Sequence, residues 1–379
     1  MQPNQPRTAR VTLDYSRRRA LTLMAGAAVA AQVPLKAHAA PGITEVPSLG
    51  NIAAQRGIVF GTAIDADTLA HSAQSNLYLH HARILTADNL MKFGSLRPQE
   101  GPADFGLADQ LVAYAAKNKI PLRGHNLIWN DWVPDWVAKL SSDRITYWLD
   151  RHIDEVVGRY AGQLQSWDVV NEPFFPLNHN PGGYRSGPWY SAMGKDYVLR
   201  ALKRARAADP TGKIVINEAG PEWENPWGPA KPYRDGLLKL VREVQDAGIK
   251  LDAVGLECHW FPQFKFDPSQ YTDYLHKLAA TGVSIYISEL DVNDAGLSGT
   301  EAARDGIVAE RFATVITASL KEPKVEMIIT WQLADSASWL MSVPKLWGPN
   351  RRRPRPLPFD HDLQPKAAYH AIAKALTLS

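Results

Sequence analysis

The amino-acid sequence predicts an α/β protein, a single (β/α)8 TIM barrel in which eight parallel strands close into a ring inside a ring of helices. Two observations predict this fold. Short apolar runs bounded by turn residues recur eight times, and amphipathic helical patterns separate them. The competing architecture is an open, doubly wound sheet. It is disfavoured because residues 61–65, at the end of the first run, lack the glycine spacing of a phosphate-binding fingerprint.

The predicted strands are short runs rich in β-branched and apolar residues. They cover residues 57–64, 83–90, 121–129, 165–172, 213–217, 251–259, 283–289 and 325–333. The fourth run ends abruptly in Asn171, Glu172 and Pro173. An apolar run of this length indicates a strand that is buried on both faces, as in a parallel sheet. Pro173 cannot extend the ladder, so Glu172 is expected at the C-terminal end of this strand.

The predicted helices cover residues 106–117, 142–160, 197–208, 232–247, 269–280, 303–320 and 366–376. In residues 142–160 the apolar side chains recur at helical spacing behind Ser142, which we expect to cap the helix. No internal repeat, low-complexity tract or long linker interrupts residues 57–379. We therefore predict one domain over residues 57–379, preceded by a lead-in over residues 40–56.

The first 39 residues have the pattern of an export signal. Arg17, Arg18 and Arg19 precede a short apolar stretch at residues 21–33, and Ala37 to Ala39 form a small-residue cleavage site. The paired arginines indicate a twin-arginine-type signal peptide over residues 1–39. A transmembrane anchor is the alternative, but the apolar stretch is too short to span a bilayer comfortably. We predict cleavage after Ala39, export to the periplasm or beyond, and no membrane association afterwards.

The composition excludes several classes of protein. Removing the six basic residues and the one acidic residue of the first 39 positions leaves 36 basic against 38 acidic residues, which does not suggest nucleic-acid binding. Cys258 is the single cysteine, so an intrachain disulfide and a cysteine-cluster metal site are excluded. Twelve tryptophans provide flat rings of the kind that line sugar-binding clefts.

Two of the predicted strands end in a glutamate, Glu172 and Glu289. A carboxylate at the C-terminal mouth of a buried strand is costly to keep there unless it has a task. Each could be a structural carboxylate paired with a basic residue. Two carboxylates on either side of a glycosidic bond can also cleave it, and at a separation of about 5–5.5 Å one attacks the sugar while the other transfers a proton.

The same strand ends carry other polar and aromatic residues suited to a hydroxyl-rich ring substrate. The candidate binding residues are Asp88, Asn89, Lys92, His125, Trp129, Asn171, Glu257, His259, Trp331 and Trp339, with Asp291 behind them. Glu257 and His259 are two residues apart and so lie on one face of their strand, and the same holds for Glu289 and Asp291.

Five ordered motifs, at residues 124–129, 167–172, 254–259, 287–291 and 331–339, resemble those of glycoside hydrolase family 10. The resemblance extends from about residue 57 to the C-terminus. It implies a (β/α)8 barrel and a retaining mechanism, chiefly that of endo-β-1,4-xylanases. It requires no metal and no organic cofactor, and we expect a monomer whose partner is a polysaccharide.

The resemblance also implies roles for individual residues. Glu172 resembles the acid/base, Glu289 the nucleophile, and Asn171 the amide that binds the sugar 2-hydroxyl. His259 would orient Glu289, and Asp291 would hold the imidazole. The remaining matches line the subsites on the non-reducing side of the cut, and they are Asn89, Lys92, His125, Trp129, Trp331 and Trp339.

Three departures from the family pattern bear on specificity. Asp88 stands where the family usually has a glutamate, Glu257 where it has a glutamine, and Trp132 replaces a common glutamine. Glu257 would either raise neighbouring carboxyl pKa values when ionised or stay protonated and donate as an amide does, and we favour the second.

These departures leave alternatives open. The same chemistry could act on a β-1,4-glucan or a bacterial exopolysaccharide. A non-catalytic carbohydrate-binding protein would be expected to lack a catalytic glutamate, and both are present. A metal-dependent hydrolase using His125, His259 and Asp291 is a weaker option, because the usual His-x-His pair on the first strand is missing.

Overall fold

A computed structural model of the protein describes residues 46–224, 229–346 and 352–377. The chain divides into two units, Met1–Ala40 and Pro41–Ser379, and all the described residues belong to the second. The predicted signal peptide and the start of the lead-in lie outside the described residues. The boundaries predicted for them stay predictions.

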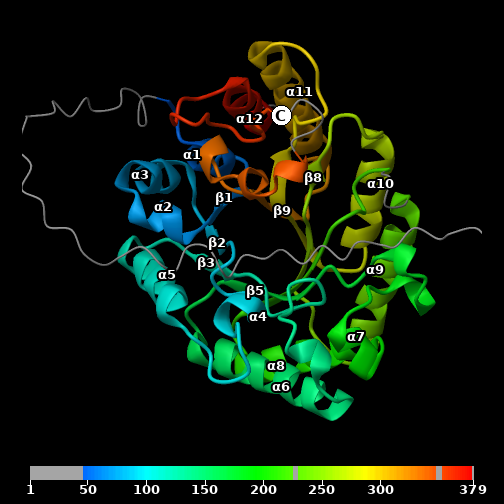
Figure 1. Ribbon diagram of the computed structural model, residues 1–379. Coiled ribbons are helices and arrows are strands. Elements are labelled where there is room, and N and C mark those ends of the chain that lie inside the picture. Colours follow the sequence, from blue (N-terminus) through cyan, green and yellow to red (C-terminus); the bar gives the residue numbers. More distant parts are fainter. Residues whose placement is uncertain (1–45, 225–228, 347–351, 378–379) are drawn as a thin grey trace, which may run out of the picture. The chain divides into compact units, whose positions relative to one another are not determined.

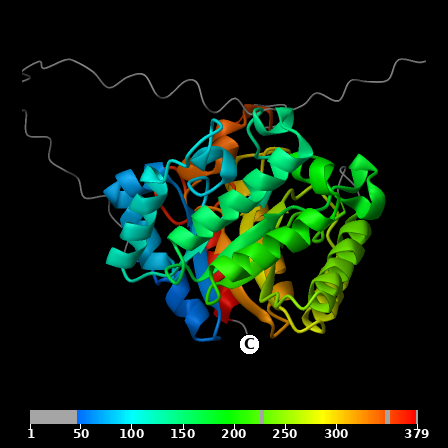
Figure 2. The ribbon, with the colours of Figure 1, turned by 90° about the horizontal axis from the view of Figure 1, so that it is seen from below.

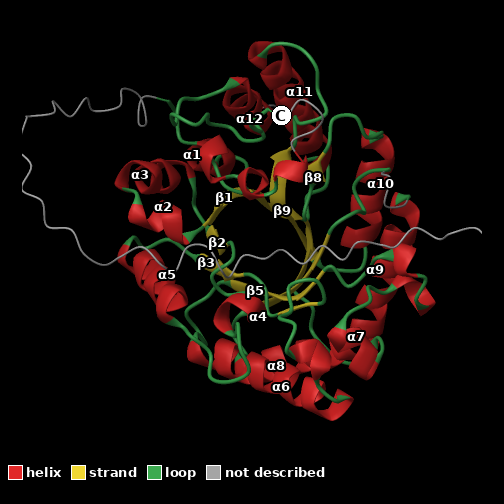
Figure 3. Ribbon diagram, in the orientation of Figure 1, coloured by secondary structure: helices red, strands yellow, loops and turns green. Residues whose placement is uncertain are grey.

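The second unit is a closed parallel barrel, which Figure 3 shows as a yellow ring of strands inside a ring of red helices. The strands follow one another around the ring in the order β10, β1, β2, β3, β5, β6, β7 and β9, and the β9–β10 pairing closes it. Their bounds are β1 Val59–Ile64, β2 Leu85–Ala87, β3 Leu122–Gly124, β5 Ser166–Asn171, β6 Lys213–Glu218, β7 Ala253–Leu256, β9 Ser284–Val292 and β10 Val325–Thr330. The predicted (β/α)8 fold is confirmed.

Two predicted strands are each divided in two. The run at 121–129 forms β3 and then β4 (Ile128–Trp129), and the run at 251–259 forms β7 and then β8 (His259–Trp260). Between β7 and β8 the backbone of Cys258 is left-handed, with φ of 58°, which no extended strand can accommodate. Between β3 and β4 the peptide bond from His125 to Asn126 is cis. Gly124 immediately precedes the first break, but the predicted strands were drawn from the apolar pattern alone, which indicated continuous strands.

The outer ring consists mainly of longer helices, coloured in chain order in Figure 1. Their bounds are α3 Ser72–His81, α5 Gly106–Lys117, α6 Ser142–Arg159, α8 Asp196–Ala208, α9 Ala230–Asp246, α10 Pro268–Ala279, α11 Glu301–Ser319 and α12 Ala367–Thr377. All seven predicted helices are present within a few residues of the expected ends. Helix α3 was not predicted, because its buried residues (Ser75, Leu77, Tyr78 and His81) include polar ones and show no apolar periodicity.

Shorter helices fill the connections. They are α1 Leu49–Ala54, α2 Ala66–Ala70, α4 Phe93–Leu96 and α7 Pro188–Met193, with 3-10 turns at Val137–Lys139, Pro176–Asn178, Pro181–Gly183, Asp335–Ala337, Trp339–Ser342 and Pro344–Leu346. One predicted cap is wrong by a residue. The N-cap of α6 is Ser141 rather than Ser142, and its side chain makes no capping hydrogen bond.

The core has two parts, as expected for a barrel. The larger part lies between the strands and the helices, where α6 buries Ile145, Leu149 and Ile153. Figure 2 shows the helices along the outside of the strands. A smaller cluster combines side chains from several barrel strands, such as Val215 of β6, Tyr286 of β9 and Ile329 of β10. Residues from so many strands can meet only inside the ring, so this cluster fills the barrel beneath its C-terminal end. Among the described helices, none is both long and apolar enough to cross a bilayer.

Candidate active site

The C-terminal ends of the strands bring the predicted polar residues together around one amide, that of Asn217 at the end of β6. Its Nδ2 atom lies 2.9 Å from Asn171 Oδ1, 3.1 Å from Glu257 Oε1 and 2.7 Å from Glu289 Oε1. Its Oδ1 atom accepts a hydrogen bond of 2.6 Å from the Ser288 hydroxyl. Side chains from β5, β6, β9 and the end of β7 therefore share a single hydrogen-bond network.

Glu289, on β9, is buried and surrounded by donors. Besides the Asn217 amide at Oε1, it has the Nε2 atom of His259 at 3.2 Å from Oε2. The Nδ1 atom of His125 lies 3.8 Å from Oε1. Burial alone would raise the pKa of the Glu289 carboxyl, but His125, His259 and Lys92 outweigh it and hold this pKa well below its usual range. Glu289 is therefore ionised at neutral pH.

His259 is held by a second carboxylate. Its Nδ1 atom donates to Asp291 Oδ1 over 2.9 Å, and the indole Nε1 of Trp339 donates to the other oxygen of Asp291 over 2.8 Å. Burial opposes the charged imidazole, but Asp291 and Glu289 raise the pKa of His259 well above its usual value. A protonated imidazole donates through both nitrogens, so it fixes the rotation of the Glu289 carboxylate.

His125 is anchored from below by a buried ion pair. Its Nδ1 atom lies 3.0 Å from Asp168 Oδ2, and the other oxygen of Asp168 pairs with Arg123. The Arg123 side chain has no exposed surface, and its Nε atom donates to the Ser166 hydroxyl over 3.0 Å. The indole of Trp331 stands edge-on to His125, with ring centroids 5.0 Å apart. Strand β5 thus supplies the support for a side chain that follows β3.

Glu172 follows β5 and has a different environment. Its Oε2 atom lies 2.5 Å from a guanidinium nitrogen of Arg185, and its side chain is 14% exposed. Burial raises the pKa of the Glu172 carboxyl, Arg185 acts against this, and the nearby carboxylates of Asp131 and Glu289 add to the rise. The net result is a pKa above the usual value. Two carboxyl groups at one centre thus have pKa values displaced in opposite directions, which is the condition for an acid and a nucleophile to coexist.

Glu257 is a third carboxyl group at this centre, and only 3% of its surface is exposed. Burial and the carboxylates of Glu289 and Glu172 raise its pKa well above the usual value. The Asn217 amide has two hydrogens for three neighbouring acceptors. A protonated Glu257 would relieve this shortage because it brings a hydrogen of its own, and we keep the prediction that Glu257 stays neutral.

Some of the predicted non-reducing-side residues, Asn89, Lys92, Trp129 and Trp331, form a second group beside β2. Lys92 Nζ donates to Asn89 Oδ1 over 2.9 Å and lies 5.3 Å and 5.9 Å from the ring centroids of Trp129 and Trp331. Asp88 is buried and accepts a hydrogen bond of 3.0 Å from Gln332 Nε2. The pKa of Asp88 is raised by burial. The indoles of Trp129 and Trp132 are parallel, with centroids 6.1 Å apart.

Sequence reasoning missed four contributors. Asn217 follows the pattern used for the others, a polar residue at a strand end, and that signal could have identified it. Arg185 lies in a loop between two short helices and carries no such signal. Asp168 and Arg123 lie inside apolar strands, where a charged residue is explained only by its partner on the neighbouring strand.

A metal site at this centre does not fit the residues well. Glu257, His259 and Glu289 offer ligand atoms that all lie within 4.8 Å of one another. However, both nitrogens of His259 are hydrogen-bonded to carboxylates, and the raised pKa of His259 indicates an imidazolium, which cannot bind a cation. Among the described residues, His125, His259 and Asp291 are not found as a set with converging ligand atoms, and Asp291 accepts a hydrogen bond from His259 itself.

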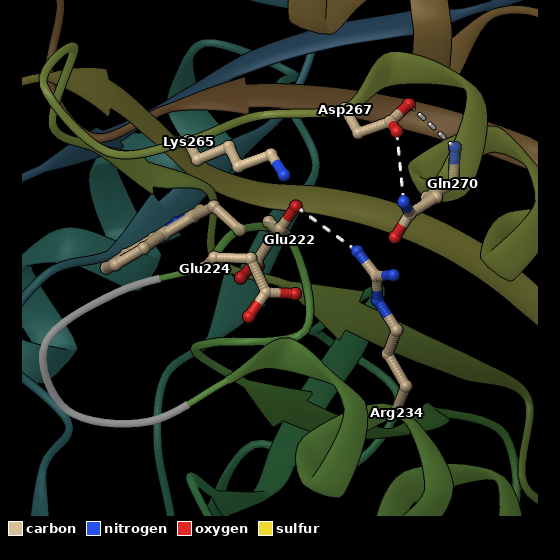
Figure 4. Close-up of a pocket in the computed structure, with 7 residues that line it drawn as sticks. Glu222, Glu224, Arg234, Lys265, Asp267 and Gln270 are labelled. Atoms are coloured by element: carbon tan, nitrogen blue, oxygen red, sulfur yellow. Dashed lines mark hydrogen bonds between the residues drawn. The ribbon is translucent and has the colours of Figure 1, made fainter.

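A separate hollow of about 340 Å³ lies beside the β6–α9 and β8–α10 connections (Figure 4). Its lining combines both signs of charge: Glu222, Trp223, Glu224, Arg234, Lys265, Asp267 and Gln270. The Glu222 carboxylate accepts from the backbone N–H groups of Gly220 and Cys258, at 2.8 Å and 3.0 Å. Asp267 is the N-cap of α10 and accepts from Ser269 and Gln270. The acidic groups are thus largely engaged in holding the two connections.

The barrel and its paired carboxyl groups define a glycoside hydrolase of the two-carboxylate class. Residues 48–375 match the family model of Glycosyl hydrolase family 10. The chain belongs to glycoside hydrolase family 10.

Similar proteins support this assignment. The chain is 31% identical over 339 residues to "Beta-1,4-xylanase" of Dictyoglomus thermophilum. The aligned region covers 87% of this chain and 91% of that protein. It is 32% identical to "Endo-1,4-beta-xylanase C" of Phanerodontia chrysosporium, over 83% of this chain and 75% of that protein. Among solved structures, native xylanase 10B from Thermotoga maritima superposes with a TM-score of 0.77 at 27% identity, covering 87% of this chain and 98% of that one.

Proposed function

We propose that this protein is a retaining endo-β-1,4-xylanase that hydrolyses internal bonds of xylan by double displacement. Glu289 acts as the nucleophile and Glu172 as the acid/base. The observation that carries the proposal is the opposite displacement of the two carboxyl pKa values at one centre. The names of the relatives, which are β-1,4-xylanases, support the choice of substrate.

In the first step Glu289 attacks the anomeric carbon, and Glu172 gives its proton to the departing glycosidic oxygen. In the second step Glu172, now ionised, takes a proton from water, and the resulting hydroxide displaces Glu289 from the sugar. The hydrogen bonds from Asn217 and His259 keep Glu289 ionised and aimed. Asn171 is the proposed partner of the sugar 2-hydroxyl, and its Oδ1 atom is fixed by Asn217.

The second candidate keeps this chemistry and changes the polysaccharide to a β-1,4-glucan or an exopolysaccharide. It is motivated by the group around Lys92, where Trp132 adds an indole whose ring centroid lies 5.0 Å from Nζ. Asp88 also contacts Gln332 in the same region. These residues lie on the side of the cut that we expect to distinguish xylose from a sugar with a hydroxymethyl group.

The test is reducing-sugar release by the purified protein from glucuronoxylan, arabinoxylan, a soluble β-1,4-glucan and xanthan-like polysaccharides, side by side. We expect rapid release of short oligosaccharides from the xylans. Activity only on the glucan or the exopolysaccharide would replace the proposed substrate with the second candidate. The anomeric configuration of the first product, followed by NMR, tests the mechanism separately, because initial inversion would contradict it.

We also infer that the mature protein is exported, as the twin-arginine-type pattern of residues 1–39 supports. Polysaccharides are too large to enter a cell intact, so a xylanase has its substrate outside. N-terminal sequencing of the protein secreted by an export-competent host checks this inference. A secreted form that began at Met1 would contradict it.

A further inference from the structure

Arg185 binds Glu172 at two points. One guanidinium nitrogen lies 2.5 Å from Glu172 Oε2, and the Nε atom donates to the main-chain oxygen of Glu172 over 2.9 Å. The Arg185 backbone N–H also donates to the carbonyl of Pro173 over 2.8 Å. Only 9% of the Arg185 side chain is exposed. This residue therefore holds both the side chain and the backbone of the segment that follows β5.

That backbone needs to be held. Glu172 has a φ of 45°, in the left-handed region that side chains other than glycine rarely adopt. Its N–H donates to the Asn217 carbonyl over 2.8 Å on one side, and its carbonyl accepts from Arg185 on the other. These two bonds fix the direction in which the Glu172 side chain leaves the end of β5.

Arg185 also has a second carboxylate partner. Its other terminal nitrogen lies 2.5 Å from Asp131 Oδ2, and half of the Asp131 side chain is exposed. Asp131 follows β4, so it approaches the guanidinium from a different segment than Glu172 does. One positive charge is thus divided between two carboxyl groups, one reactive and one facing solvent.

We propose that Arg185 and Asp131 are positioning residues for the acid/base: Arg185 holds the Glu172 carboxylate while it is ionised, and Asp131 draws charge from Arg185 so that Glu172 can take up a proton again. This inference rests on the proposed role of Glu172. Glu172 alternates between the two forms in every catalytic cycle. If Glu172 were the only partner of the Arg185 guanidinium, the ionised form of Glu172 would be favoured throughout the cycle. The second partner, Asp131, offsets this preference.

The electrostatics agree with this division. After burial, Arg185 acts to lower the pKa of Glu172, and Asp131 acts to raise it. Other titratable groups that face Glu172 are Glu218, Tyr233, Glu257, His259 and Glu289. The same groups are present in the parent and in both variants, and among them Glu218 also interacts with Arg185.

The first test compares the pH dependence of kcat/KM on xylan for Arg185→Met and Asp131→Asn. Its alkaline limb reports the loss of the proton from the acid. We expect the limb to move to higher pH in Arg185→Met, since a lowering charge is lost, and to lower pH in Asp131→Asn. Arg185→Lys keeps the charge and should leave the limb close to that of the parent. Limbs that do not move, or that move in the same direction in the first two variants, would overturn the proposal.

The second test separates positioning from general damage to the fold. An aryl β-xylobioside with a dinitrophenolate leaving group departs without protonation, whereas xylan requires it. We expect Arg185→Met to lose about tenfold or more in kcat/KM on xylan, within the range of general acid catalysis, and much less on the aryl substrate. Equal losses on both substrates would mean a merely structural role. Asp131 is half exposed, so Asp131→Asn tests the proposal even if Arg185→Met does not fold.

A matched control uses an arginine–aspartate pair on the outer helices. Arg200 of α8 pairs with Asp150 of α6 at 2.6 Å. Arg200→Met should leave the pH profile unchanged, and a similar shift there would overturn the assignment to Arg185. Failure of the proposed function is seen separately, because the parent would then hydrolyse neither xylan nor the aryl β-xylobioside.

Discussion

Asn217 donates through Nδ2 to Glu289 Oε1 over 2.7 Å, and the same side chain is anchored by the Ser288 hydroxyl at its carbonyl oxygen. The main-chain oxygen of Asn217 accepts the Glu172 N–H over 2.8 Å. One residue of β6 therefore contacts both proposed catalytic residues, the one that follows β5 and the one on β9.

Replacing Asn217 should consequently damage catalysis more than stability. In Asn217→Ala, Glu289 loses a neutral donor to its charged oxygen, an interaction worth about 1.5–3 kcal/mol. We expect kcat/KM on xylan to fall by roughly 10- to 100-fold. Steady-state kinetics and thermal unfolding of the same preparation check this. Asn118→Ala, at the exposed end of α5, is the control that should show neither change. Retention of full activity by Asn217→Ala would show that the amide does not act on Glu289.

The proposed roles of Glu172 and Glu289 predict different responses to amide substitution. Glu289→Gln removes the nucleophile and should abolish hydrolysis of both xylan and a dinitrophenyl β-xylobioside. Glu172→Gln should reduce kcat/KM on xylan by about 10²- to 10⁴-fold, because acid catalysis is lost. On the aryl substrate the same variant should retain a much larger share of its kcat/KM. Side-by-side kinetics on the two substrates check the assignment, and the reverse pattern would exchange the two roles.

The raised pKa of Glu257 predicts in which direction the stability of the protein changes with pH. Its pKa is raised in the folded protein, so above pH 4.5, the ordinary pKa of a glutamate, the unfolded chain releases a proton that the folded protein keeps. Stability contributed by this group is therefore complete below pH 4.5 and falls as the pH rises toward the folded pKa. Glu257→Gln keeps the shape and removes the titration.

The melting temperature of Glu257→Gln relative to the parent should accordingly increase as the pH rises from 4.5 toward neutrality. The pH profile of kcat/KM should also change, since Glu257 neighbours Glu172 and Glu289. An identical profile in parent and variant would show that the three carboxyl groups are not coupled.

The buried pair of Arg123 and Asp168 predicts a large loss of stability when it is broken. Arg123→Met leaves Asp168 buried beside His125 without its cation, which typically costs about 3–5 kcal/mol. The double variant with Asp168→Asn should recover part of this loss, because no unpaired charge remains. Chemical denaturation of the parent, Arg123→Met, Asp168→Asn and the double variant completes the double-mutant cycle. Arg159→Met, which breaks an exposed pair with Asp109, should change stability by less than about 1 kcal/mol.

Much of this protein could be read from its sequence. The alternation of apolar runs with amphipathic patterns predicted the closed barrel. A strand buried on both faces is a continuous apolar run, whereas a helix buried on one face has apolar residues at helical spacing. The position of Glu172 directly after β5 followed from the same patterns. Glu289 does not end its strand as predicted, because β9 continues to Val292, and His259 begins the short strand β8. Helix α3 escaped prediction because its buried face includes polar residues such as Ser75 and His81.

Only the tertiary structure decided which residues that are distant in the chain contact one another. Arg185 and Glu172 are 13 residues apart, but a guanidinium in a loop has no partner until the loop folds back onto the end of β5. Asn217 and Glu289 are 72 positions apart, on β6 and β9, and they meet because the parallel strands of the barrel, including β7 between these two, all have their C-terminal ends on the same side. The local sequence determines the spacing of buried side chains and therefore which segments form strands and which form helices. The charge state of a carboxyl group depends on desolvation and on its neighbours across the barrel, which exist only after the ring closes.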